Sequence, residues 1–244
     1  MSDAPGIALV TGAAGGIGRA VVERLVRDGM RVGALDVNAE GLVALAADRP
    51  DVLALTGDVT DENEIRAAFE ALRGHWGEPD VVVNVAGYFA RHRVPDLSRS
   101  DWDRFLAVNA TGPFLVCREA LPAMIAAGTG CIVNIASTAG LQGGRDRAAY
   151  CAAKGALVQL TRSLAIDHGP DGVRINAVAP GLIDTEMADW IRHDPAVLAS
   201  FEASLPAGRM GTVQEVADTV AYLVSPAATY VMGATVAVDG GSSA

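Results

Sequence analysis

Short apolar runs alternate with helical patterns along the 244 residues of this chain. Residues 7–11 are apolar and end at glycines, and the apolar positions that follow recur every three or four residues, as in an amphipathic helix. Residues 31–36 are strand-like again, so this part predicts a βαβ unit of about thirty residues. The same pattern predicts further strands at 51–58, 80–87, 130–137, 172–180 and 234–239, and helices at 61–73, 101–127, 148–168 and 212–224.

Seven strands, most of them next to a helix, predict an α/β protein with a single-domain Rossmann fold. In such a fold the sheet is parallel and doubly wound, with helices on both faces, and its strands are buried on both sides. No stretch resembles a domain linker, so residues 1–244 are expected to form one domain. Residues 182–209 contain Pro195 and Pro206 and are the least regular part, and we interpret them as a segment that covers the substrate.

The charge balance argues against two classes of partner. The formal net charge is -10 and the sequence pI is near 4.8, whereas nucleic-acid phosphates require a basic surface, and anionic membranes would repel the chain. No apolar stretch approaches the roughly 18 residues of a membrane span, and the N-terminal residues lack the basic region and apolar core of a signal peptide. We therefore expect a cytoplasmic protein that binds neither nucleic acid nor membrane.

Cysteine and histidine positions give no metal-ligand pattern. Cys117, Cys131 and Cys151 show no paired spacing, which fits a reduced compartment without a disulfide framework. The four histidines are far apart in the sequence and form no known ligand motif. We predict no catalytic metal.

A glycine-rich turn, TGAAGGIG at 11–18, lies between the first strand and its helix. Backbone amides and a helix N-terminus at this position can hold a pyrophosphate. Gly12, Gly16 and Gly18 are not spaced as G-x-G-x-x-G, and the turn lacks the lysine of a phosphate-binding P-loop, so a plain tight turn is the alternative.

Asp36 ends the second strand and predicts the choice of cofactor. A carboxylate there can accept both adenosine ribose hydroxyls and would repel a 2′-phosphate, which favours NAD(H) over NADP(H). Arg19 and Arg31 remain possible cations for a 2′-phosphate, and a turn residue before Asn38 is the alternative role for Asp36.

Tyr150 and Lys154 lie four residues apart in RAAYCAAKGAL, thirteen positions after Ser137. On a helix, positions i and i+4 share a face, so the ammonium lies close enough to stabilise a phenolate. A phenol ionises near pH about 10, so an acid/base tyrosine at neutral pH needs such help. The same spacing also occurs by chance on many helices.

With these motifs in order, the chain resembles the short-chain dehydrogenases/reductases over nearly its full length. The matching motifs are TGAAGGIG (11–18), Asp58 in GDVT, NVAG (84–87), VNATG (108–112), Ser137, the Tyr150 and Lys154 pair, PGLIDT (180–185) and VDGG (238–241). Val85 departs from the family's second asparagine, but it lies on a strand that should be buried, so little effect on the chemistry is expected.

The resemblance implies a catalytic set of Asn109, Ser137, Tyr150 and Lys154. Tyr150 is expected to exchange a proton with the substrate oxygen, Ser137 to orient that oxygen, and Lys154 to lower the phenol pKa and hold ribose hydroxyls. Asn109 is expected to anchor a water on the proton path. The alternatives are that Ser137 caps a turn and that Asn109 only interrupts a helix.

The resemblance also implies a set of residues that bind NAD(P). In it, Asp58 and Val59 flank the adenine, and Ile183 and Thr185 contact the nicotinamide amide. The full set is Gly12, Gly16, Ile17, Gly18, Asp36, Asp58, Val59, Asn84, Ala86, Gly87, Tyr150, Lys154, Pro180, Gly181, Ile183 and Thr185.

Three segments, 88–96, 138–147 and 182–209, are expected to line the substrate pocket. Arg91, Arg93 and Arg145 would suit an anionic substrate, unless residues 145–147 form a solvated loop whose charges compensate each other. The other candidates are Tyr88, Phe89, His92, Leu141, Gln142, Met187, Trp190 and Ile191.

The sequence thus predicts an oxidoreductase that transfers a hydride between NAD(H) and a secondary alcohol or ketone. One alternative is an NADPH-dependent 3-oxoacyl-carrier-protein reductase, and another is a non-catalytic protein that senses NAD(H). By resemblance we expect a homotetramer with the helices at 101–127 and 148–168 between subunits.

Overall fold

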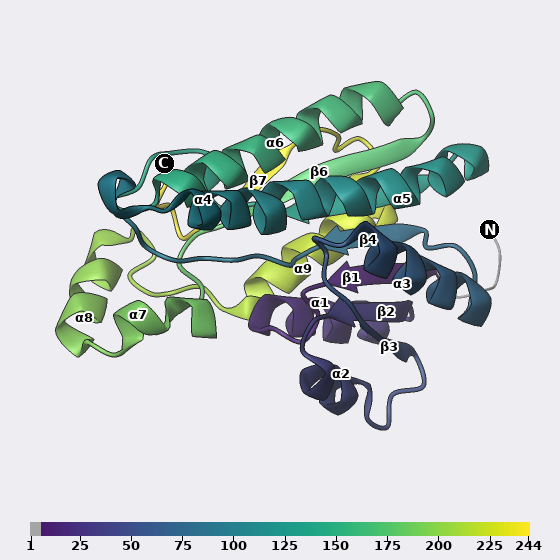
Figure 1. The fold of residues 1–244 in the computed structure, drawn as a ribbon, viewed down its shortest axis with the longest axis horizontal. Coiled ribbons are helices and arrows are strands. Elements are labelled where there is room, and N and C mark those ends of the chain that lie inside the picture. Colours follow the sequence, from purple (N-terminus) through teal and green to yellow (C-terminus); the bar gives the residue numbers. More distant parts are fainter. Residues whose placement is uncertain (1–5) are drawn as a thin grey trace.

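Seven parallel strands form one sheet in the order β3-β2-β1-β4-β5-β6-β7 (Figure 1). The structure, a computed structural model, describes residues 6–244 except for the side chains of Trp190 and Arg192. The strands are β1 (Ile7–Thr11), β2 (Arg31–Asp36), β3 (Val52–Thr56), β4 (Val81–Asn84), β5 (Gly130–Ile135), β6 (Val173–Pro180) and β7 (Thr235–Val238). The predicted doubly wound parallel sheet is confirmed, and the strand order reverses between β1 and β4.

Helices cover both faces of this sheet. The longer ones are α1 (Gly16–Arg27), α2 (Ala39–Ala46), α3 (Glu62–His75), α4 (Arg99–Leu106), α5 (Gly112–Ala127), α6 (Ala148–His168), α8 (Pro195–Ser204) and α9 (Val213–Val224). Short turns of helix are η1 (Val94–Asp96), η2 (Ala107–Thr111), η3 (Thr138–Gly140), η4 (Glu186–Ala188), α7 (Asp189–Arg192) and η5 (Pro226–Ala228). None of the helices in the described part of the chain is both long and apolar enough to cross a membrane.

Alternate residues of each central strand enter two different cores. On β1, Ala8 and Val10 pack with residues of α1, α2 and α9, whereas Ile7 and Leu9 pack with residues of α3 and α5. Both sets are at most 9% exposed, which explains why the strands read as continuous apolar runs rather than as alternating patterns.

Polar caps start most helices, and α1 is an exception that matters for the site. Asp61 accepts hydrogen bonds from two amides of α3, and Thr212 and Glu215 form a capping box at α9. Gly15 precedes α1 and offers no side-chain cap. The first-turn amides of α1 therefore depend on another partner.

The helix predicted over 101–127 is wrong as one continuous element. It consists of α4, a π-helical turn at Ala107–Thr111, and α5. The Asn109 side chain donates to the carbonyl of Phe105, four residues earlier, at 3.0 Å, and Pro113 has no amide hydrogen to donate. Both features favour a widened turn over a regular α-helix.

Residues 182–209 contain helices that the pattern did not predict. η4, α7 and α8 lie here, and Figure 1 shows α7 and α8 at the end of the molecule where the C-terminus also lies. Asp194 caps α8 by accepting from the amides of Ala196 and Val197. The helix α2 was missed as well, although Asn38 caps it by accepting from the amide of Gly41 at 3.0 Å.

Candidate active site

A cavity of about 600 Å³ opens at the carboxyl ends of β1, β2, β4, β5 and β6. In doubly wound sheets, ligands bind at this edge, beside the point where the strand order reverses. Residues that were predicted to bind cofactor and that line the cavity are Gly12, Gly16, Ile17, Gly18, Asp36, Ala86, Gly87, Tyr150, Lys154, Pro180, Gly181, Ile183 and Thr185. The structure thus brings most of the predicted set to one place.

The glycine turn packs so tightly that side chains are excluded at two positions. Gly12 has a φ of +64°, and a Cβ there would lie 2.6 Å from the amide nitrogen of Ala86. A Cβ on Gly18 would lie 1.9 Å from the carbonyl oxygen of Gly12. These contacts bring the start of α1 against the loop after β4, where its uncapped amides can receive an anionic group.

Asp36 is held by backbone amides on both of its carboxylate oxygens. Its Oδ2 accepts from the amide of Ala14 at 3.0 Å and its Oδ1 from the amide of Asn38 at 2.9 Å. Each oxygen keeps further acceptor capacity, and the residue lines the cavity. The turn role and the ligand role for Asp36 are therefore compatible.

The two arginines that could have opposed NAD(H) selectivity each have another partner. Arg31 begins β2, so the strand places it about 16 Å from Asp36, over the ring of Trp76. Arg19 pairs with Glu23 on the exposed face of α1 at 3.3 Å.

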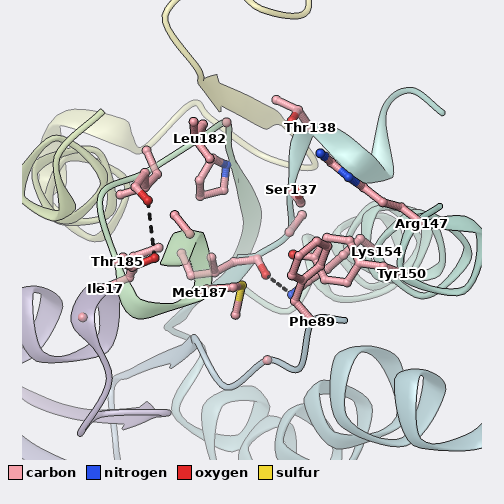
Figure 2. A pocket seen from close by; sticks show the side chains of 18 of the residues that line it. Ile17, Phe89, Ser137, Thr138, Arg147, Tyr150, Lys154, Leu182, Thr185 and Met187 are labelled. Atoms are coloured by element: carbon pink, nitrogen blue, oxygen red, sulfur yellow. Dashed lines mark hydrogen bonds between the residues drawn. The ribbon is translucent and has the colours of Figure 1, made fainter. Parts of the chain in front are cut away.

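Tyr150 lies on α6 with its phenol directed to Ser137, which follows β5. Figure 2 shows the two side chains facing the same space, with the ring of Phe89 beside Tyr150. The centroids of these two rings lie 5.0 Å apart. Burial raises the pKa of Tyr150 to about 12, against the smaller lowering effects of the neighbouring Ser137 hydroxyl and the charge of Arg147. In the free protein the phenol is thus protonated at neutral pH. The expected lowering of its pKa below the usual range is not found here.

Lys154 is buried, 3% exposed, and is the only lysine of the sequence. Its Nζ donates to the carbonyl of Ile135 at 2.8 Å, which Figure 2 marks, and lies 5.9 Å from the centroid of the Tyr150 ring. Burial lowers the pKa of Lys154 to about 8. At pH 7 the group is therefore still mostly protonated, and it loses its proton near pH 8.

Asn109 is fully buried and fixes the loop after β4. Its Oδ1 accepts from the amide of Tyr88 at 3.1 Å, and its Nδ2 donates to the carbonyl of Tyr88 at 2.8 Å. A Cβ on Gly87 would lie 3.3 Å from this Oδ1 and 3.7 Å from Nζ of Lys154. Asn109 and Lys154 thus flank the same glycine.

Three members of the predicted cofactor set lie outside the cavity lining. Asp58 accepts from the amide and hydroxyl of Thr60, both at 2.8 Å, and Val59 is buried beside Gly112. Asn84 is buried in β4 and donates to Oδ1 of Asn134 at 2.9 Å. That contact joins β4 to β5.

The substrate end of the cavity differs in part from the sequence prediction. Phe89, Arg91, Gln142, Arg145 and Met187 line it, whereas Tyr88, His92, Arg93, Leu141 and Ile191 do not. The side chain of Trp190 lies outside the described part of the structure. Ser242 lies outside the three predicted segments, whereas other lining residues lie inside them but were not named as candidates: Thr138, Arg147, Glu186, Phe201, Ser204 and Leu205.

Arg147 lies in the predicted segment 138–147, where we considered it only as part of a solvated loop, although the sequence offered a signal for a role in the site. It precedes Tyr150 by three positions, and residues three apart on a helix are neighbours. Phe201 and Leu205 lacked such a signal, because the irregular pattern of 182–209 did not predict α8. Over residues 6–244, no three His, Cys, Asp or Glu side chains gather closely enough to hold a metal ion.

Known proteins match this chain over nearly its whole length. A short-chain family model described as enoyl-(acyl carrier protein) reductase matches residues 12–243. A 2-(R)-hydroxypropyl-CoM dehydrogenase of Xanthobacter autotrophicus is 41% identical, with 98% of each chain covered. A 3-oxoacyl-(acyl-carrier-protein) reductase of Salmonella typhimurium is 36% identical, with 96% of each chain covered. The solved structure of an actinorhodin polyketide ketoreductase variant with NADPH superposes with a TM-score of 0.95 at 35% identity, covering 98% of this chain and 97% of that one.

Proposed function

Because the chain belongs to the short-chain dehydrogenase/reductase family, we propose that it transfers a hydride between NAD(H) and a secondary alcohol or its ketone, with Tyr150 as general acid/base. The coarser statement, an oxidoreductase acting on alcohols or ketones, follows from the family and its relatives. The observation that supports the finer proposal most is that Tyr150 and Ser137 face the same space in the cavity that also contains the glycine turn.

The residues present fit a nicotinamide dinucleotide. The uncapped start of α1 suits a pyrophosphate and the Asp36 carboxylate suits a ribose, while Tyr150 and Lys154 line the same cavity. When bound, the cofactor accepts or supplies the hydride at its nicotinamide ring.

Tyr150 and Ser137 handle the substrate oxygen in this proposal. In ketone reduction, the carbonyl carbon gains the hydride while the protonated phenol of Tyr150 gives its proton to the oxygen. In alcohol oxidation, the C–H bond breaks, the hydride leaves, and the hydroxyl proton passes to the Tyr150 phenolate. The Ser137 hydroxyl orients the reacting oxygen in both directions.

Lys154 has two roles in the proposal. One ammonium hydrogen is directed to Ile135, which leaves two donors for ribose hydroxyls. Its lowered pKa also lets it pass a proton onward. Since Asn109 and Lys154 flank Gly87, a water between them would complete a path away from Tyr150.

Selectivity for NAD(H) is tested by Asp36→Ala. We expect NADH affinity to fall about 10- to 100-fold, because hydrogen bonds from ribose hydroxyls to a carboxylate are lost, and the ratio of NADPH to NADH affinity to rise. Fluorescence titration with both cofactors measures this. Asp167→Ala, an exposed aspartate on α6, is the matched control. An unchanged ratio in Asp36→Ala would remove Asp36 from the ribose site.

Reduction of 3-oxoacyl groups on a carrier protein remains a second candidate function, because one relative at 36% identity is named as such a reductase. It predicts turnover of oxoacyl thioesters with NADPH, which Asp36 disfavours. The third candidate function is non-catalytic sensing of NAD(H). A protein that only binds NAD(H) would not need an acid/base tyrosine such as Tyr150 beside Ser137.

A panel of alcohols, ketones and an oxoacyl thioester with NAD(H) and NADP(H), read at the nicotinamide absorbance, separates these functions. We expect turnover of at least one neutral alcohol or ketone with NAD(H). Tight NADH binding without any turnover would contradict the proposed function and support the sensor.

We further propose that residues 182–209 cover the substrate and that residues 1–244 act as one domain. Supporting this, Met187 of η4 and Phe201 and Leu205 from the α8 region line the cavity. The isolated bridge between Ile183 and Gly211 joins the two ends of this segment.

A homotetramer is proposed from the outer faces of α5 and α6. Phe114 and Ile125 on α5 are 41% and 37% exposed, and Ile166 on α6 is 77% exposed. Burial of these side chains between subunits would remove apolar surface from water. We expect light scattering coupled to size exclusion to give about four times the chain mass, and a stable monomer would contradict this.

A further inference from the structure

Arginines gather at the substrate end of the cavity. Arg91, Arg145 and Arg147 line it there, in a chain whose formal net charge is -10. Among the described lining residues the carboxylates are Asp36, at the ribose end, and Glu186, on η4. The part of the cavity near Tyr150 thus carries a local excess of positive charge.

Arg147 is the most enclosed of the three arginines. It is half-buried, whereas Arg91 and Arg145 are exposed. Its guanidinium carbon lies 5.8 Å from the centroid of Phe89, whose ring is 5.0 Å from that of Tyr150. Figure 2 shows its guanidinium end directed toward Thr138 and the space in front of Ser137. The cation therefore lies within reach of a substrate held at Tyr150.

The charge environment of Arg147 favours an anion in the cavity. Burial is the largest effect that lowers the pKa of Arg147, and repulsion by the Arg91 guanidinium lowers it further. The carboxylate of Asp146, between Arg145 and Arg147 in sequence, pairs with Arg91 at 3.2 Å. A negatively charged group on the substrate would reduce the repulsion between the guanidinium groups of Arg91 and Arg147. It would also offset the free-energy cost of burying the charge of Arg147.

We propose that the substrate carries a carboxylate that Arg147 binds, with Arg91 adding attraction at longer range. This inference rests on the proposed function and specifies its substrate class: hydroxy acids and oxo acids whose acid group is separated from the reacting carbon. A guanidinium fork matches a carboxylate in two parallel hydrogen bonds, which fixes the orientation of the reacting oxygen at Ser137 and Tyr150.

Matched ketone probes test the proposal. The wild type is assayed with NADH and either 4-oxopentanoate or its uncharged amide, 4-oxopentanamide. We expect kcat/KM to be higher for the acid than for the amide by about 10- to 100-fold, the range of a charge-assisted hydrogen bond. In Arg147→Leu this ratio should fall to about 1, and Arg147→Lys should recover only part of it. Arg93 lies in the loop after β4, close in sequence to Arg91, and does not line the cavity. Arg93→Gln therefore removes a cation outside the proposed site and should leave the ratio unchanged.

Binding and turnover separate failure of this inference from failure of the proposed function. Calorimetric titration of both probes measures the acid preference even without turnover, and it should fall in Arg147→Leu by the same factor as the kinetic ratio. Turnover of the amide as fast as the acid, or equal calorimetric affinities for both probes, overturns the carboxylate site and leaves hydride transfer standing. An acid preference that persists in Arg147→Leu overturns the assignment of Arg147.

Discussion

Tyr150→Phe is expected to lower kcat by about 10²- to 10⁴-fold, the contribution of a positioned general acid or base. The phenol is buried and its pKa is raised to about 12, so it is protonated and ready to donate to a ketone oxygen. Phenylalanine keeps the ring against Phe89 and removes only the hydroxyl. NADH affinity should therefore change less than about tenfold, as for one neutral hydrogen bond. Stopped-flow turnover and fluorescence titration measure the two quantities.

Tyr88→Phe is the matched control because it removes the same atom from a ring outside the cavity. Tyr88 packs on Phe105 at 5.0 Å and under Arg104, so its hydroxyl has no part in the proposed chemistry. We expect this variant to retain the wild-type kcat. A Tyr150→Phe protein with near wild-type turnover would assign the proton to another group, with Ser137 or Lys154 the next to examine.

Lys154→Met is expected to stabilise the fold near pH 7 while removing activity. Burial lowers the pKa of Lys154 from 10.5 to about 8. The unfolded chain therefore binds more protons between those two values, so the free energy of unfolding of the wild type rises with pH from about 8 to about 10.5. Below pH 8 the full cost of the buried charge is present. Methionine has no charge, so it should raise the free energy of unfolding by up to ~3 kcal/mol at pH 7.

Urea unfolding of both proteins at pH 7, 8, 9 and 10 measures this difference. The gain of Lys154→Met should shrink as the pH approaches about 10, because the wild type then folds with a neutral amine. Above pH about 10 the raised pKa of Tyr150 acts in the opposite sense, which limits the useful window. Arg162→Met, which removes an exposed cation from the same helix, should change stability by less than about 0.5 kcal/mol. If Lys154→Met were no more stable than the wild type at pH 7, favourable interactions of the Lys154 ammonium would offset the cost of burying its charge.

The sheet could be predicted from the sequence because buried parallel strands leave a local signature. Residues 7–11 and 31–36 read as apolar runs bounded by glycines or an aspartate, and β1 and β2 have those bounds. The break between α4 and α5 could not be predicted, because it depends on the contacts that Asn109 makes with Phe105 and with the distant Tyr88. Such contacts exist only after folding.

The candidate active site also combines features that the sequence predicts with features that depend on the folded structure. Spacing alone placed Tyr150 and Lys154 on one helix face, and the structure puts both in the cavity. Spacing could not give the direction in which the pKa of Tyr150 shifts, because burial by neighbours such as Phe89 outweighs the lowering effects of Ser137 and Arg147. It also could not choose among the arginines. Arg145 and Arg147 differ by two positions in sequence, and only the fold makes one exposed and the other half-buried.

A chain with a single lysine has one ε-amine, and that amine lies inside the cavity. Protein grown on carbon-13 lysine would therefore give one ε-methylene signal, with no assignment step. Its chemical shift against pH reads the ionisation of Lys154 directly. The same signal, followed during addition of NAD⁺ and then of a trial substrate, reports on each binding event at the proton path, including for compounds that the protein binds without converting.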